Sequence, residues 1–250
     1  MHRYFEINEG GHNIRCKLYY QDLKSIRRIV LFCHGFAGHK DNGAAEKLAE
    51  RLLSKYKGWA LVTFNLPVHG DDVKKKLCLA DCDAYLGLIL SHLQQKYQPE
   101  GLYACATSFG GYLVLKYIFE HGNPFRKVML RCPAVNMYEV LNRGIMASED
   151  IEKLRKGKEI AVGFDRKIPI SLAFLEELQE KDIQQWDYLD YAEDILIVHG
   201  TADTVVPFAA AEAFAEKNLI ELIPAEKADH RFQHPGSMEL AIRETLAFFV

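Results

Sequence analysis

The chain has 250 residues, of which 49% are hydrophobic and 26% charged, so it can bury one large core or two small ones. Its net charge of −3, with both signs mixed along the chain, gives no electrostatic reason to bind nucleic acid or an anionic membrane surface. No apolar run approaches the ~18 residues of a membrane-spanning helix, and the first residues lack a signal-peptide pattern. We therefore expect a cytoplasmic protein that binds neither nucleic acid nor membrane.

The cysteines and histidines form no metal-binding or redox pattern. The six cysteines lie mostly in apolar, strand-like runs without a paired CxxC spacing, which is typical of buried free thiols in a reducing compartment. The ten histidines include no HExxH or comparable ligand spacing. We therefore expect neither a metal nor an organic cofactor.

Before residue 101 the chain alternates between strand-like runs and amphipathic segments. Alternating apolar and polar residues on both sides of Gly10-Gly11 predict an antiparallel hairpin. Two continuous apolar runs further on predict strands that are buried on both faces. The expected elements are strands at 3–8, 12–20, 28–33 and 59–66, with helices at about 42–56 and at 79–97.

The stretch 102–111 places a serine at a sharp turn. An apolar strand leads to Ser108, and residues 112–119 have the pattern of a helix. The small residues Ala106 and Gly110, two positions before and two after the serine, permit a turn this tight. Such a turn lifts the serine Oγ out of the sheet and directs the next backbone N–H toward the group that the serine attacks. Taken alone, the pattern favours this turn, with a glycine-rich helix start as the alternative.

A strand at 127–132 ends at Pro133, and the region 134–190 then changes character. It is rich in charge, carries two helical patterns and has no convincing central strand. We interpret it as a small cap inserted above the sheet, with two ordinary surface helices as the alternative. Its aromatic residues either line a substrate pocket or pack the cap onto the core. They are Tyr138, Phe164, Phe174, Trp186 and Tyr188.

The strand pattern resumes after residue 190. Strands alternating with helices along the whole chain predict a single α/β domain over 1–250, with a mostly parallel sheet and helices on both faces. Functional groups are then expected at the carboxyl ends of the strands. The last elements are strands at 194–199 and 218–223, helices at 208–217 and 237–249, and a loop at 225–232.

Three of the predicted strand ends carry the groups that nucleophilic catalysis needs. Ser108, Asp203 and His230 each follow a different strand, in the order that α/β enzymes with a serine nucleophile use. A serine hydroxyl is a poor nucleophile at neutral pH, so it needs a base, and an imidazole is suited to that task. A carboxylate holds the imidazole in the correct tautomer. The backbone N–H groups of Phe109 and Phe36 are candidates for stabilising the oxyanion.

The sequence resembles a compact serine hydrolase of the α/β-hydrolase superfamily, over nearly its whole length. It is most similar to the subgroup of carboxylesterases, cinnamoyl (feruloyl) esterases, monoglyceride lipases and serine aminopeptidases. The resemblance implies the α/β-hydrolase fold and the catalytic roles just described. It is carried by five motifs, in this order: His34-Gly35-Phe36, Pro67-Val68-His69-Gly70-Asp71, Ala106-Thr107-Ser108-Phe109-Gly110-Gly111, His199-Gly200-Thr201-Ala202-Asp203-Thr204-Val205-Val206-Pro207 and Ala228-Asp229-His230-Arg231-Phe232.

The departures from this pattern are small. Ala106 stands where glycine is usual, and Thr107 where this subgroup often has histidine. Alanine still fits the turn, so the nucleophile assignment is retained. The loop around His69 also lacks the Arg-Gly or Asn-Gly usually seen before its His-Gly pair.

Other residues compete for the catalytic roles. His234 is an alternative base, but the motif around His230 favours the latter. Asp229 is too close to its neighbour to orient that ring, and Asp194 begins its strand and lies at the wrong end of the sheet. The remaining candidates, His34, His199, His69 and Asp71, are expected to organise loops, and Cys105 is expected in the core.

The sequence thus predicts a serine esterase for small or medium carboxylic esters, with cinnamoyl or aryl esters as the preferred class. Ser108 is the nucleophile, His230 the base and Asp203 the orienting acid. A serine aminopeptidase or acyltransferase with the same triad is the alternative, and a binding protein that kept the fold without the chemistry is a third. The sequence leaves the oligomeric state open.

Overall fold

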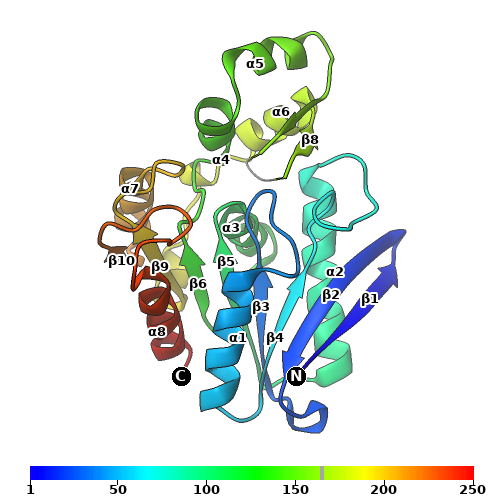
Figure 1. Ribbon diagram of the computed structural model, residues 1–250, viewed down its shortest axis with the longest axis vertical. Coiled ribbons are helices and arrows are strands. Elements are labelled where there is room, and N and C mark those ends of the chain that lie inside the picture. Colours follow the sequence, from blue (N-terminus) through cyan, green and yellow to red (C-terminus); the bar gives the residue numbers. More distant parts are fainter. Residues whose placement is uncertain (164–165) are drawn as a thin grey trace.

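The computed structural model describes residues 1–163 and 166–250, and its centre is an eight-stranded sheet (Figure 1). The strand order is β1-β2-β4-β3-β5-β6-β9-β10. The first two pairings are antiparallel and all the others are parallel. The strands are β1 (His2–Glu9), β2 (His12–Tyr20), β3 (Arg28–Cys33), β4 (Trp59–Phe64), β5 (Gly101–Thr107), β6 (Val128–Arg131), β9 (Ile195–Gly200) and β10 (Glu221–Ala225).

Helices cover both faces of the sheet because its central strands are apolar on both sides. In β3, Ile29 and Leu31 belong to one core cluster and Val30 and Phe32 to the other, as the alternation of a strand requires. Helices α1 and α8 pack on the second cluster, and α2, α3 and α7 on the first. Their bounds are α1 (Gly43–Lys55), α2 (Leu79–Tyr97), α3 (Phe109–His121), α7 (Phe208–Asn218) and α8 (Ser237–Phe249). The predicted α/β class is confirmed.

Local sequence signals define where the helices begin. The side chain of Asn42 accepts hydrogen bonds from the backbone N–H groups of Ala44 and Ala45, which caps α1. Helix α3 instead begins directly after Ser108, whose side chain makes no cap bond. The serine hydroxyl is therefore not used in starting the helix that it precedes.

The region 134–190 lies above the carboxyl ends of the strands (Figure 1). It contains a hairpin that the sequence pattern did not predict, because its two strands have only three residues each. Its role as a cap stays a prediction. Its elements are α4 (Met137–Glu139), a π-helix at Val140–Ile145, α5 (Ser148–Arg155), β7 (Ile160–Val162), β8 (Ile168–Ile170), α6 (Leu172–Glu180) and short 3-10 helices at Ile183–Gln185 and Leu189–Asp194.

The last strand was predicted three residues too early. Helix α7 continues to Asn218, and Leu219 then adopts a left-handed conformation with φ of 56°. The chain leaves this turn before it pairs with β9, so β10 spans Glu221–Ala225 instead of 218–223. The Asn218 side chain supports this end, because its amide donates to the carbonyl of Phe214.

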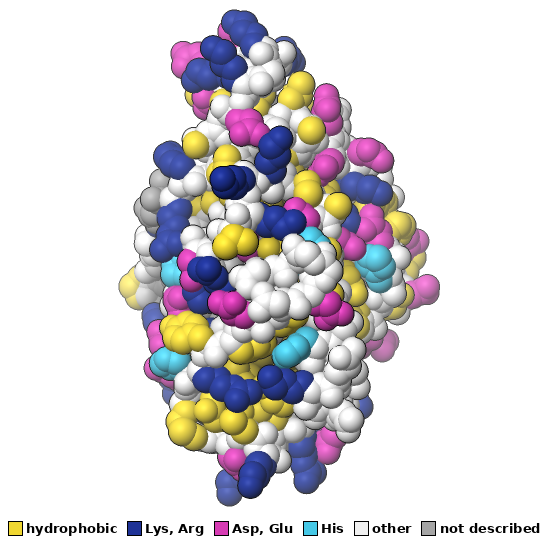
Figure 2. Space-filling model, turned by 90° about the vertical axis from the view of Figure 1, so that its right-hand side faces the viewer, with side chains coloured by type: hydrophobic (Ala, Val, Ile, Leu, Met, Phe, Trp, Pro, Cys, Tyr) yellow, Lys and Arg dark blue, Asp and Glu magenta, His cyan; other side chains and the backbone are white. Residues whose placement is uncertain are grey.

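The ends of the chain lie away from the region 134–190. Figure 1 shows both termini at the opposite end of the sheet, near the amino ends of the parallel strands. Figure 2 shows cationic and anionic side chains interspersed on the face that carries β1 and β2. No helix among the described residues combines the length and apolar character that crossing a bilayer requires.

Candidate active site

Ser108 occupies a strained turn between β5 and α3. Its φ and ψ are 51° and −119°, a conformation that non-glycine residues seldom adopt. Close packing holds the turn in place. A Cβ on Gly110 would lie 2.3 Å from the carbonyl oxygen of Cys33, and one on Gly111 would lie 2.9 Å from Pro133 Cβ. The two glycines are therefore required by contact with the neighbouring segments.

Asp203 lies in the turn after β9, and its side chain is fully buried. One carboxylate oxygen accepts hydrogen bonds of 2.8 Å from the backbone N–H groups of both Val205 and Val206. The other lies 2.7 Å from His230 Nδ1 and 3.4 Å from His199 Nε2. Burial alone would raise the pKa of Asp203, but these hydrogen bonds hold it well below its usual range. The group is therefore a carboxylate at neutral pH.

His230 lies in the loop after β10, with its side chain 17% exposed. The bond to Asp203 assigns the proton to Nδ1, so a neutral ring carries its lone pair on Nε2. That is the atom through which a histidine takes a proton from a serine. The geometry between acid and base is therefore the one that general-base catalysis needs.

Ser108 and His230 line one cavity of about 610 Å³ at the carboxyl ends of the strands. Residues from seven separate stretches of the chain form its walls. Gly35 and Phe36 follow β3, Thr204 and Val205 follow β9, and Ile145 comes from the π-helix in the region 134–190. The sheet thus brings the three residues predicted from the sequence to one edge, as the strand-end rule requires.

The two amides expected to bind an oxyanion also lie at this edge. A Cβ on Gly35 would lie 3.1 Å from Ser108 Cβ, so the loop that carries Phe36 is packed against the serine turn. The rings of Phe36 and Phe109 are 5.9 Å apart. Within the described chain, neither amide N–H donates a hydrogen bond to a protein acceptor. Phe36 lines the cavity, so its amide is available to a ligand, whereas Phe109 directly follows Ser108 and is buried.

Two buried histidines hold the Phe36 loop. His34 accepts a hydrogen bond of 3.2 Å from the backbone N–H of Leu66, and its Nδ1 lies 2.8 Å from the carbonyl oxygen of Gly35. Burial lowers the pKa of His34 to about 3, helped by the neighbouring His69. Burial likewise lowers the pKa of His69 to about 4, although its bond to the Pro67 carbonyl opposes this. Both rings are neutral near pH 7, which suits loop support better than proton transfer.

The competing candidates lie in other places. His234 is exposed and does not line the cavity. Asp229 lines it, but one of its oxygens accepts a 2.7 Å bond from the backbone N–H of Gln233, as expected of a loop carboxylate. Asp194 pairs with Lys127 beside the amino end of β9. Asp71 accepts hydrogen bonds from Lys40 and Asn65 and ties down its loop. Cys105 is buried in the core.

Sequence reasoning missed two residues of this edge. Arg131 is the last residue of β6, and Cys132 follows it. Arg131 lines the cavity. Cys132 has a φ of 44°, and its Sγ lies with atoms of Asp203 and His230 within 4.8 Å of one another. The one signal in the sequence is an arginine at the end of a buried strand, and it does not show that this strand end lies beside Ser108 and Asp203.

The three groups Cys132, Asp203 and His230 could in principle hold a metal ion. Burial and the charge of Asp203 raise the pKa of the Cys132 thiol well above its usual value, so it stays protonated. The carboxylate of Asp203 already accepts bonds from two amides and an imidazole. This donor set suits a serine triad and fits a metal poorly.

The aromatic residues of the region 134–190 that can be placed pack against α3. Phe174 lies edge-on to Phe109 at 6.2 Å, and Trp186 stacks on Phe119 at 4.3 Å. The hydroxyl of Tyr188 donates to the carbonyl of Leu115. None of these three lines the cavity, nor does Tyr138. Phe164 lies outside the described residues.

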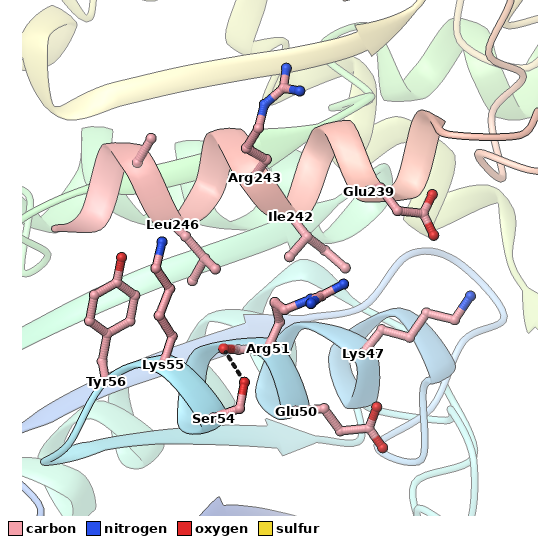
Figure 3. Close-up of a pocket in the computed structure, with 11 residues that line it drawn as sticks. Lys47, Glu50, Arg51, Ser54, Lys55, Tyr56, Glu239, Ile242, Arg243 and Leu246 are labelled. Atoms are coloured by element: carbon pink, nitrogen blue, oxygen red, sulfur yellow. Dashed lines mark hydrogen bonds between the residues drawn. The ribbon is translucent and has the colours of Figure 1, made fainter.

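A larger hollow, of about 880 Å³, is an open groove between α1 and α8 (Figure 3). Its walls carry the side chains of Lys47, Arg51 and Lys55 from α1, with Arg243 from α8. None of the three predicted catalytic residues lines it.

Comparison with known proteins agrees with this architecture. A model of the alpha/beta hydrolase fold family matches residues 28–158, which is more than half of the chain. The chain belongs to the α/β-hydrolase fold family. The match includes the serine turn and the loop of Phe36. A comparison with curated protein sequences found no match.

Several solved structures share this α/β-hydrolase fold over almost their whole length. Est1E from Butyrivibrio proteoclasticus, solved with ferulic acid bound, is 18% identical, with a TM-score of 0.71 over 98% of this chain and 97% of that one. A putative hydrolase from Agrobacterium vitis S4 is 18% identical, with a TM-score of 0.77 over 100% and 99%. The esterase domain of a Rhodothermus marinus protein is 18% identical, with a TM-score of 0.71 over 99% and 97%. At this identity the likeness establishes the fold alone.

Proposed function

We propose that this α/β-hydrolase cleaves small or medium carboxylic esters through an acyl-enzyme on Ser108. The observation that carries the proposal is the 2.7 Å bond from His230 Nδ1 to the buried carboxylate of Asp203, beside the strained serine in one cavity. Acid, base and nucleophile come from three different strand ends. Such a combination has a direct chemical use and no evident structural one.

The proposed reaction has two halves. Ser108 Oγ forms a bond to the ester carbonyl carbon while His230 Nε2 takes the hydroxyl proton, and the amides of Phe36 and Phe109 stabilise the oxyanion. The carbon–oxygen bond to the alcohol then breaks, and His230 gives its proton to the leaving oxygen. A water molecule, deprotonated by His230, then attacks the acyl carbon. The bond from this carbon to Ser108 Oγ breaks, His230 returns its proton to Oγ, and the carboxylic acid leaves. Asp203 stays ionised and stabilises the imidazolium in both halves.

Aryl and cinnamoyl esters are the substrates that we favour. The support is the likeness to Est1E, whose structure was solved with ferulic acid, together with a cavity large enough for a small aromatic acid. An aminopeptidase needs a carboxylate from the region 134–190 to hold the substrate ammonium group. Among the described lining residues, that region contributes only the apolar Ile145. This observation favours esters over aminoacyl substrates.

The test is hydrolysis of 4-nitrophenyl butyrate by the wild type and by Ser108→Ala. We expect the variant to lose about 10³-fold or more in kcat/KM and to lose labelling by a fluorophosphonate, because the nucleophile is gone. Ser54→Ala is the matched control, since Ser54 lies on the groove side of α1 and donates to the Arg51 carbonyl. A wild type without esterase activity, or a Ser108→Ala variant as active as the wild type, would refute the mechanism.

A further inference from the structure

Arg131 places a guanidinium group in the wall of the catalytic cavity. It ends β6 and pairs in register with Thr107, the residue before the nucleophile. Its backbone carbonyl accepts a 3.1 Å hydrogen bond from the N–H of Ser108. Since Arg131 follows Leu130, it shares a sheet face with Met129, the face that α1 and α8 cover. The cation thus lies on the α1–α8 side of the cavity, one strand away from the serine.

The contacts of this guanidinium group satisfy only part of it. One terminal nitrogen lies 3.4 Å from the sulfur of Met238, a weak acceptor, and the group lies over the ring of Phe232 at 5.2 Å. Its Nε is buried and has no hydrogen-bond partner. A guanidinium group offers five N–H donors, so most of its hydrogen-bonding capacity remains for something else.

No carboxylate among the described residues forms an ion pair with Arg131. Asp203 and Asp229 act on it only as charges at longer range. The first is bound to His230 and the second to the backbone N–H of Gln233. Arginine stays protonated at physiological pH, so the cavity wall keeps a positive charge. Burying a charge without a full set of partners costs free energy, and a bound ligand of opposite charge can offset that cost.

We propose that Arg131 binds a carboxylate carried by the substrate, so that the preferred ester has an anionic group at its acyl or alcohol end. This inference rests on the proposed esterase function and names the substrate class. A guanidinium group matches a carboxylate through two parallel hydrogen bonds. Asn42 and Gly43, at the positive end of the α1 dipole, line the same cavity and add a weaker attraction for an anion.

A carboxylate fits this site better than a phosphate dianion. Besides Arg131 the wall carries Arg231, whose side chain is exposed, while Asp203 and Asp229 place two negative charges nearby. One guanidinium group neutralises a monoanion, whereas a dianion keeps a further charge that these carboxylates repel. Glutarate carries its two charges on separate carboxylates, so one end can bind Arg131 as a single negative charge while the other stays in solvent. Glutarate should therefore compete with substrate more strongly than inorganic phosphate does at the same concentration.

The experiment compares two aryl esters of equal chain length. One is the mono-4-nitrophenyl ester of glutaric acid and the other is 4-nitrophenyl valerate, which replaces the carboxylate by a methyl group. A second pair tests the alcohol end of the ester. It compares esters of 4-hydroxybenzoate, whose leaving group carries a carboxylate, with esters of 4-methylphenol, whose leaving group carries a methyl group instead. The readout is the ratio of kcat/KM for the acidic ester to that for the neutral one. It is measured for the wild type, Arg131→Met and Arg131→Lys, with Arg51→Met in the α1–α8 groove as matched control.

We expect Arg131→Met to lower this ratio by about tenfold or more at one of the two ends, mainly through KM, and Arg131→Lys to lower it less. Arg51→Met should keep the wild-type ratio. A purely structural role, in which Arg131 only supports Phe232 and the His230 loop, would reduce kcat/KM for both esters by the same factor. An unchanged ratio in Arg131→Met at both ends therefore overturns the inference and leaves the esterase proposal intact.

Binding without turnover separates the two proposals. If the wild type cleaves no ester, the proposed function fails, and thermal unfolding in the presence of glutarate still tests the arginine. Glutarate should raise the Tm of the wild type and of Arg51→Met but leave that of Arg131→Met unchanged. The inference is refuted if glutarate raises the Tm of Arg131→Met as much, or if phosphate and glutarate stabilise the wild type equally.

Discussion

The cavity at the carboxyl ends of the strands and the groove between α1 and α8 differ in how their polar groups are held. The groove is larger and richer in lysine and arginine. Its charged side chains extend from the exposed faces of two helices, as Figure 3 shows. In the cavity, Asp203 is fully buried and bound by four donors or close contacts, and Ser108 adopts a strained backbone conformation. A catalytic site is expected where the fold holds polar side chains in fixed positions, as it does in the cavity. The larger volume of the groove therefore does not make the groove the better candidate.

The sharpest test of this contrast is Asp203→Asn. An asparagine amide would donate to His230 and favour the tautomer in which Nε2 carries the proton, so the base would be lost. We expect kcat/KM for 4-nitrophenyl butyrate to fall about 10⁴-fold with little change in the fold. Asp194→Asn, at the other end of the sheet, should retain the activity of the wild type. The contrast breaks if a charge removed from the groove, as in Lys55→Ala, costs as much activity as Asp203→Asn.

A second test concerns the packing that holds the serine turn. Gly110→Ala would place a methyl group against the Cys33 carbonyl oxygen, where only 2.3 Å is available. We expect this overpacking to lower the free energy of unfolding by about 1–3 kcal/mol and to reduce kcat by displacing Ser108. Gly87→Ala is the matched control. Gly87 lies within α2, and its new Cβ would meet only the side chain of Tyr117, at 3.7 Å. We therefore expect denaturant unfolding to show a free energy of unfolding that is about 0.5–1 kcal/mol higher than that of the wild type. Equal stability of the two variants would contradict the packing argument.

A third effect follows from the neutral histidines below the cavity. His34 and His69 have pKa values of about 3 and about 4 in the folded chain, against 6.5 for an ordinary histidine. The unfolded state therefore binds more protons below pH 6.5, and the free energy of unfolding falls as the pH drops from about 6.5 to about 4. We expect a loss of a few kcal/mol, since one pKa unit corresponds to about 1.4 kcal/mol.

Denaturant unfolding at several pH values measures this loss. His69→Phe removes one of the two titrating rings and should make stability less dependent on pH. Gln95→Ala, at an exposed position of α2 without an ionisable group, should leave the dependence as in the wild type. If the wild type is as stable at pH 4 as at pH 7, these histidines do not titrate as their burial requires.

Much of the fold could be predicted from the sequence, because buried parallel strands are continuous apolar runs. The bounds predicted for β3, α2 and α8 match those observed. The last strand was misplaced because nothing in the local pattern shows that Leu219 adopts a left-handed conformation. The β7–β8 hairpin was missed because strands of three residues are too short to show a periodicity.

The candidate site was predictable only as far as it lies in motifs. Ser108, Asp203 and His230 were found because each follows a recognisable strand in an expected order. Arg131 and Cys132 were missed because their importance depends on strand order. Strand β6 lies between β5 and β9, which brings its end beside both the serine and the aspartate. A single sequence does not reveal which strands are neighbours.

The position of the two termini has a practical consequence. Both lie beside the amino ends of the parallel strands, whereas the cavity opens at the carboxyl ends (Figure 1). A tag, a solid support or a second enzyme can therefore be joined at Met1 or Val250 without covering the cavity mouth. Molecules immobilised through either terminus would present the cavity to the solution, which makes this fold convenient for oriented attachment in a flow reactor.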